Sequence, residues 1–110
     1  MEKLVRDKIP EIIERETGQS INYRFATPKQ MPNLRLRKLR EEIIEFGFAI
    51  DDLESGFGQE EAVVDELSDV SQILIAMGSE SGIKSTIVEA RRKEKYEDKG
   101  GFDYGIVMDF

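Results

Sequence analysis

The sequence predicts an all-α protein, a four-helix bundle formed by one domain over residues 1–110. Three observations indicate this fold. Apolar residues recur at intervals of three and four in the central segments, the spacing of a helix that packs lengthwise on another helix. Glycine-containing breaks separate the helical segments and leave only short connections between them. A chain of 110 residues also has the length of one ordinary domain.

The first helical segment is predicted to begin at Pro10 and to end at Gly18. Proline suits the first helical position, and glycine suits the position just past the end of a helix. Residues 20–26 are then predicted to be extended, because apolar residues such as Tyr23 and Phe25 alternate with polar neighbours.

A long helix is predicted from Leu34 to Leu53. Residues 27–30 before it have the form of a capping box, and Pro32 indicates that this turn is separate from the helix. Gly47 weakens the helix interior and could bend it. The apolar stripe of this helix has the spacing 3,4,3,4,3 and consists of Leu36, Leu39, Ile43, Phe46, Ile50 and Leu53.

Two further apolar residues of this helix, Ile44 and Phe48, lie opposite the stripe. A helix that is apolar on both sides has two surfaces to pack against. The second partner is either another subunit or a local surface such as the segment of Tyr23 and Phe25.

The remaining elements follow from their boundaries. Residues 55–58 form a turn, residues 60–77 a helix, residues 78–82 a break, and residues 84–97 a final helix. The tail from residue 102 to residue 110 is short, and an extended conformation is expected at residues 106–108.

Composition excludes several classes of function. The chain has no cysteine and no histidine, which removes thiolate catalysis, zinc–thiolate sites and the commonest general base. A net charge of −7 argues against binding to polymeric nucleic acid. No apolar run is long enough to span a membrane and no signal peptide is evident, so we expect a cytoplasmic protein.

The carboxylates of the two central helices are the main functional indication. Glu66 and Asp69 fall inside the apolar half of the third predicted helix, one turn apart. Glu42 and Glu45 have the same spacing and border the stripe of the preceding helix, with Lys38 on the same ridge. If these helices pack antiparallel, up to four carboxylates face one another.

Facing carboxylates repel, and burying them unpaired is costly, so either their pKa values rise and they are protonated or a cation lies among them. Lys38 alone carries too little charge to balance four carboxylates. Oxygen-only ligation suits Mg²⁺, Mn²⁺ or Ca²⁺, although the spacing is not that of an EF-hand. The alternative is that these acidic pairs are solvated faces or partners of lysine, as on many charged helices.

The acidic motifs also resemble those of a known family. Residues 41–45 (EEIIE) and 66–70 (ELSDV), separated by 20 residues, resemble the EExxE…ExxD motif of the MazG-type all-alpha NTP pyrophosphatases. Residues 3–13 and 92–102 resemble the two ends of its phosphoribosyl-ATP pyrophosphohydrolase-like, house-cleaning branch.

This resemblance implies a helical bundle completed by a homodimer or homotetramer, and Mg²⁺-dependent hydrolysis of a nucleoside triphosphate to monophosphate and pyrophosphate, with Mn²⁺ as a substitute ion. The implied metal ligands are Glu42, Glu45, Glu66 and Asp69. A carboxylate not fully used in ligation, Glu41 or Glu45, would take the proton of the attacking water. The implied phosphate-binding residues are Lys38, Arg92, Lys95 and Lys99, with Arg6 and Lys8 as further candidates.

Three other interpretations remain open. A true phosphoribosyl-ATP pyrophosphohydrolase of histidine biosynthesis would share the chemistry and differ in its substrate pocket. A non-catalytic helical module for oligomerisation or binding would use the acids structurally, and a lapsed relative would bind nucleotide without cleaving it. A P-loop NTPase is excluded, because the glycines of residues 55–58 lack the Lys-Ser/Thr that follows a Walker loop.

Overall fold

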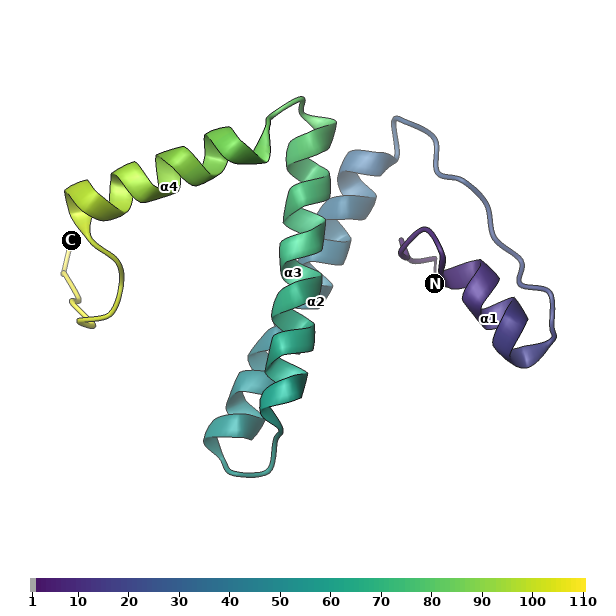
Figure 1. Ribbon diagram of the computed structural model, residues 1–110, viewed down its shortest axis with the longest axis horizontal. Helices are drawn as coiled ribbons and strands as arrows, with labels where there is room; N and C mark the ends of the chain where they lie inside the picture. Colours follow the sequence, from purple (N-terminus) through teal and green to yellow (C-terminus); the bar gives the residue numbers. More distant parts are fainter. Residues whose placement is uncertain (1) are drawn as a thin grey trace. The chain divides into compact units, whose positions relative to one another are not determined.

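The computed structural model describes residues 2–110 and contains four α-helices and no β-strand in that range (Figure 1). The all-α prediction is therefore confirmed. The chain divides into two compact units, of which the first ends at Met77 and the second comprises Gly78–Phe110. That the two form a single domain stays a prediction.

Helix α1 spans Ile9–Thr17 and has the predicted boundaries within one residue. Pro10 lies in its first turn, where the missing N–H has no helical partner. Gly18 ends the helix in the left-handed conformation, with φ 69°, and its N–H donates to the Glu14 carbonyl oxygen at 2.8 Å. Glycine adopts this φ without the steric cost that a Cβ brings.

The connection from α1 to α2 is held by side chains. Residues 19–27 form no strand. The Arg24 guanidinium donates to both carboxylate oxygens of Glu2, at 2.8 and 2.9 Å. The Thr27 N–H donates to the Gln30 side chain at 3.1 Å, which is one half of the predicted capping box.

Helix α2 spans Met31–Glu54, so it begins three residues before the predicted start. Pro32 lies within its first turn rather than ahead of it. The helix continues through Gly47 without a break, and a Cβ at Gly47 would meet open space. Neither packing nor backbone conformation requires glycine at this position.

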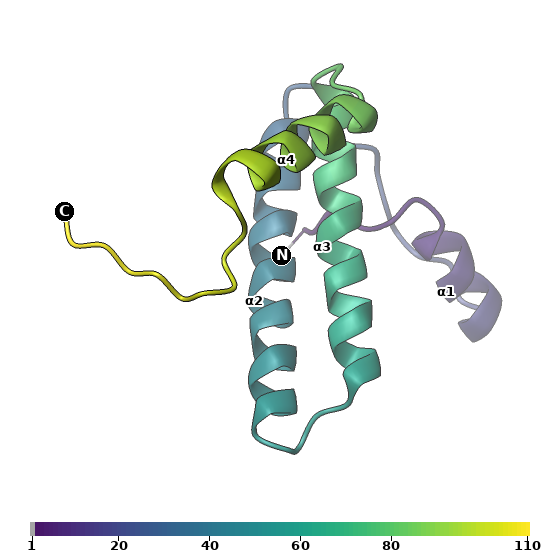
Figure 2. The same cartoon turned by 60° about the vertical axis from the view of Figure 1, so that its left-hand side comes forward.

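A tight turn joins α2 to α3, which spans Glu60–Glu80 and extends beyond the predicted end at Met77. The N–H groups of Phe57 and Gly58 both donate to the Asp52 carbonyl oxygen, at 3.0 and 2.9 Å. A Cβ on Gly58 would lie 2.8 Å from the Leu53 nitrogen, so this close return of the chain depends on glycine. Within the first unit, α2 and α3 lie side by side and antiparallel (Figures 1 and 2).

The core of the described residues is small. Only Glu42, Ala49 and Ile73 are buried. The predicted stripe of α2 is incompletely covered, because each central helix buries one line of side chains against the other and little else packs on it. Ile44 and Phe48 stay 58% and 65% exposed, so the segment of residues 20–26 does not bury them.

The second unit contains the end of α3, helix α4 (Ser85–Lys99) and the tail. The Ile83 N–H donates to the Gly78 carbonyl oxygen at 2.9 Å in the connection between the helices. Gly100 ends α4, and its N–H donates to the Tyr96 carbonyl oxygen at 2.8 Å.

Candidate metal centre

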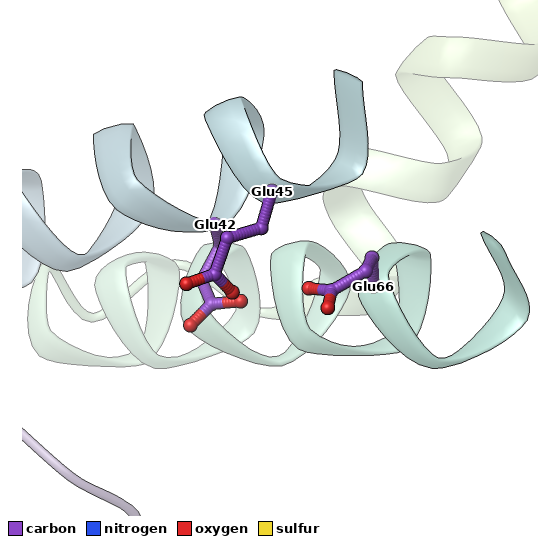
Figure 3. Close-up of side chains that lie close together, drawn as sticks. All are labelled: Glu42, Glu45 and Glu66. Atoms are coloured by element: carbon purple, nitrogen blue, oxygen red, sulfur yellow. The ribbon is translucent and has the colours of Figure 1, made fainter. Parts of the chain in front are cut away.

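Three glutamates converge between α2 and α3. Glu42 and Glu45 on α2 and Glu66 on α3 each place a carboxylate oxygen within 4.8 Å of the other two (Figure 3). We call these residues the carboxylate cluster. The structure thus brings together three of the four metal ligands implied by the family resemblance.

The helix period explains why these side chains meet. Glu42 and Ala49 are two turns apart on α2 and are both buried, so they share the face that meets α3. Glu66 and Ile73 have the same spacing on α3. The cluster therefore lies in the line of contact that otherwise forms the core of this helix pair.

Two carboxylate oxygens of the cluster lack partners. Oε2 of Glu42 and Oε2 of Glu66 are buried and accept no hydrogen bond. The Glu42 side chain is only 6% exposed, and its Oε1 is paired with Lys38 Nζ at 3.0 Å. A buried carboxylate oxygen without a donor is costly, and a cation removes that cost.

The donor set fits a hard divalent cation. It contains only carboxylate oxygens, the ligands that suit Mg²⁺, Mn²⁺ and Ca²⁺. Carboxylates from both helices would hold a cation at this place.

The electrostatics of the cluster are those of crowded negative charges. The pKa of Glu45 is raised above its ordinary range, first by burial and then by repulsion from Glu42 and Glu66. Burial alone would lower the pKa of Lys38, but its bond to Glu42 and its attraction to Glu42, Glu41 and Glu45 raise it. Lys38 thus stays charged and partly neutralises the site.

The fourth implied ligand, Asp69, is held elsewhere. It follows Glu66 by one turn of α3, but its Oδ1 accepts a hydrogen bond from Arg6 Nη2 at 2.6 Å. The two residues are 63 positions apart, and no local pattern in the sequence links them.

Glu41, the alternative catalytic base, forms ion pairs with two lysines. Its Oε1 lies 3.1 Å from Lys3 Nζ and 3.7 Å from Lys38 Nζ. The bond from Lys3 and the charge of Lys38 lower the pKa of Glu41. Sequence reasoning missed the role of Lys3, whose only signal was the run of charges before α1.

A small pocket of about 130 Å³ adjoins this region and is lined in part by Lys3, Arg37, Lys38 and Glu41. Sites for drug-sized ligands usually measure about 300–1,000 Å³. The pocket therefore has room for a phosphate-sized group beside Lys38, but not for a nucleotide.

The other implied phosphate-binding residues, Arg92, Lys95 and Lys99, lie on α4 in the second unit. Arg92 forms a double hydrogen bond with Glu89, at 2.9 and 2.6 Å. Lys99 lines a hollow of about 440 Å³ between the end of α4 and the tail. Their contact with phosphates stays a prediction.

Comparisons with protein-family models, with curated proteins and with solved structures find no match for this chain. Among the helices of residues 2–110, none combines the length and apolar character needed to cross a membrane.

Proposed function

We propose that this protein is a Mg²⁺-dependent nucleotide pyrophosphohydrolase that converts a nucleoside triphosphate to its monophosphate and pyrophosphate. The observation that carries the proposal is the carboxylate cluster, with its two buried, unpartnered oxygens. The resemblance of residues 41–45 and 66–70 to the MazG-type motif supports it, because all three cluster residues, two on α2 and one on α3, occupy acidic positions of the motif.

Each residue of the site has a proposed role. Glu42, Glu45 and Glu66 hold the ion, and a bound Mg²⁺ supplies Lewis acidity at the phosphoryl oxygens and at the attacking water. A carboxylate oxygen that is not used in ligation, on Glu45 or on Glu41, accepts the proton of that water. Lys38 contacts the phosphates, and Arg92, Lys95 and Lys99 are further candidates for that role.

The test is pyrophosphate release from a panel of canonical and damaged nucleoside triphosphates in Mg²⁺ or Mn²⁺. We expect Glu66→Gln to abolish release, since it removes one ligand charge with little change of shape. Asp65→Asn is the matched control, because Asp65 is the exposed neighbour on α3 and lies outside the cluster. Full activity of the Glu66→Gln variant would contradict the proposed function.

We further propose that a second copy of the chain completes the site. The exposed Ile44 and Phe48 form an apolar surface on α2, and the pocket beside Lys38 is too small for a nucleotide. A dimer or tetramer would cover that surface and add walls to the pocket. Light scattering after size-exclusion chromatography should give an oligomer for the native chain and a smaller species for Phe48→Lys, while a monomeric native chain would refute self-association.

Two alternatives are separated by simple measurements. A phosphoribosyl-ATP pyrophosphohydrolase would cleave phosphoribosyl-ATP in preference to every other member of the panel. A non-catalytic module, which the exposed apolar surface also suits, would release no pyrophosphate and would gain no thermal stability from Mg²⁺ or Mn²⁺.

A further inference from the structure

The N-terminal segment, residues 2–8, is bonded to both helices that carry the carboxylate cluster. Lys3 pairs with Glu41 on α2 at 3.1 Å, and Arg6 pairs with Asp69 on α3 at 2.6 Å. Neither acid belongs to the cluster, but Glu41 immediately precedes Glu42 and Asp69 follows Glu66 by one turn. The segment therefore places two positively charged side chains, Lys3 and Arg6, at the edges of the cluster.

The Arg6–Asp69 pair differs in kind from the Lys38–Glu42 pair. Lys38 and Glu42 are packed together, with side chains 23% and 6% exposed, whereas Arg6 and Asp69 are 54% and 37% exposed. A hydrated pair of this kind is weak and easily exchanged. Arginine also keeps its charge throughout the accessible pH range, so it can free Asp69 only by moving away.

We propose that Arg6 is a positioning residue that competes with the divalent cation for Asp69. Without the cation, Arg6 holds the Asp69 carboxylate at the edge of the cluster. When Glu42, Glu45 and Glu66 bind a cation, Asp69 leaves Arg6 and joins them as a fourth ligand. This inference rests on the proposed metal centre. It implies that cation binding is weakened by the free energy needed to break the Arg6–Asp69 pair.

The competition predicts the direction in which the cation affinity changes when Arg6 is replaced. Removing Arg6 should strengthen cation binding, whereas loss of a merely structural contact would leave it unchanged or weaken it. The gain should be about two- to fivefold in Kd, since exposed ion pairs have small net strengths. Asp69 is required for the gain, because the gain arises only through that carboxylate.

The experiment is titration of the metal-free full-length chain with Mn²⁺, followed by calorimetry and by the electron paramagnetic resonance signal of free Mn²⁺. Arg6→Gln should lower the Kd for Mn²⁺ about two- to fivefold. Lys3→Gln is the matched control: it removes one positive charge and one ion pair from the same segment, but its partner Glu41 is not a proposed ligand. Its Kd should equal that of the native chain.

A double-mutant cycle completes the test. In an Asp69→Asn background, Arg6→Gln should no longer change the Kd. The inference is overturned if Arg6→Gln leaves the Kd unchanged or raises it, if Lys3→Gln gives the same gain, or if the gain persists with Asp69→Asn. In those cases native binding of Mn²⁺ still supports the metal centre, whereas a folded native chain that binds no Mn²⁺ overturns both.

Discussion

Lys38 and Glu42 form an enclosed ion pair one turn apart on α2, with Nζ and Oε1 separated by 3.0 Å and side chains only 23% and 6% exposed. The pair uses only one oxygen of Glu42, and the other, Oε2, is buried without a partner. Lys38 therefore supplies a counter-charge to Glu42 and leaves its other carboxylate oxygen available to a metal ion.

Replacing Lys38 should destabilise the metal-free protein. Lys38→Met keeps the length of the side chain but leaves the buried Glu42 carboxylate without its counter-charge, so the free energy of unfolding should fall by about 1–3 kcal/mol. Urea denaturation measures this change. Arg40→Met is the control, because Arg40 is exposed on the same helix and should alter stability little. If Lys38→Met and Arg40→Met lower the free energy of unfolding equally, the Lys38–Glu42 pair does not stabilise the protein more than an exposed charge does.

Divalent cations should stabilise the fold through the cluster. Ligand at a hundredfold excess over its Kd adds about 2.7 kcal/mol to the free energy of unfolding, so Mg²⁺ or Mn²⁺ should raise the melting temperature. Glu42→Gln should abolish most of that rise, since it replaces a charged ligand by an amide. Thermal scans with and without EDTA measure the effect. If Mg²⁺ or Mn²⁺ still raised the melting temperature of Glu42→Gln to the same extent, the cation would bind outside the carboxylate cluster.

The raised pKa of Glu45 predicts how stability depends on pH. The folded chain binds this proton more tightly than the unfolded chain, because burial disfavours the ionised form and Glu42, Glu66 and Glu41 repel it. The contribution of Glu45 is therefore fully present below the ordinary glutamate pKa and is lost as pH rises through the raised value. Lys38 faces the same group and opposes this loss.

The measurement is the difference in melting temperature between the metal-free native chain and Glu45→Gln from acid to neutral pH. Relative to the variant, the native chain should become less stable as pH rises, and saturating Mg²⁺ should reduce this trend. A difference that is independent of pH would show that Glu45 titrates alike in the folded and unfolded chains.

Gly47, in the interior of α2, and Gly58, in the α2–α3 turn, should respond in opposite directions to substitution by alanine. Gly47→Ala should raise the free energy of unfolding by about 0.5–1 kcal/mol, because alanine favours a helix interior and the added Cβ meets open space. Gly58→Ala should lower it, because the Cβ would lie 2.8 Å from the Leu53 nitrogen. Urea unfolding of both variants gives the comparison, and stabilisation by Gly58→Ala would contradict the described turn.

Local pattern was sufficient to predict the helices and the meeting of Glu42, Glu45 and Glu66. Their positions follow from the helix period and from a turn too short for anything but an antiparallel pair. The pairing of Arg6 with Asp69 could not be predicted in this way, because it joins residues 63 positions apart through a segment without secondary structure.

The exposure of Ile44 and Phe48 was equally outside the reach of periodicity. The spacing of apolar residues shows that a helix has two surfaces to cover, but it carries no information about what covers them. The described residues exclude burial by the segment of residues 20–26 and leave self-association as the proposal.

All three carboxylates of the cluster belong to one helical hairpin, and this has a consequence for the order of folding. Contacts between residues near in sequence form faster than distant ones, so the hairpin closes before residues 2–8 find their partners 38 and 63 positions away. A metal ion present during refolding would therefore bind the three glutamates and Asp69 before Arg6 pairs with Asp69. Chains refolded with Mg²⁺ should reach the loaded state without first passing through the arginine-bound one.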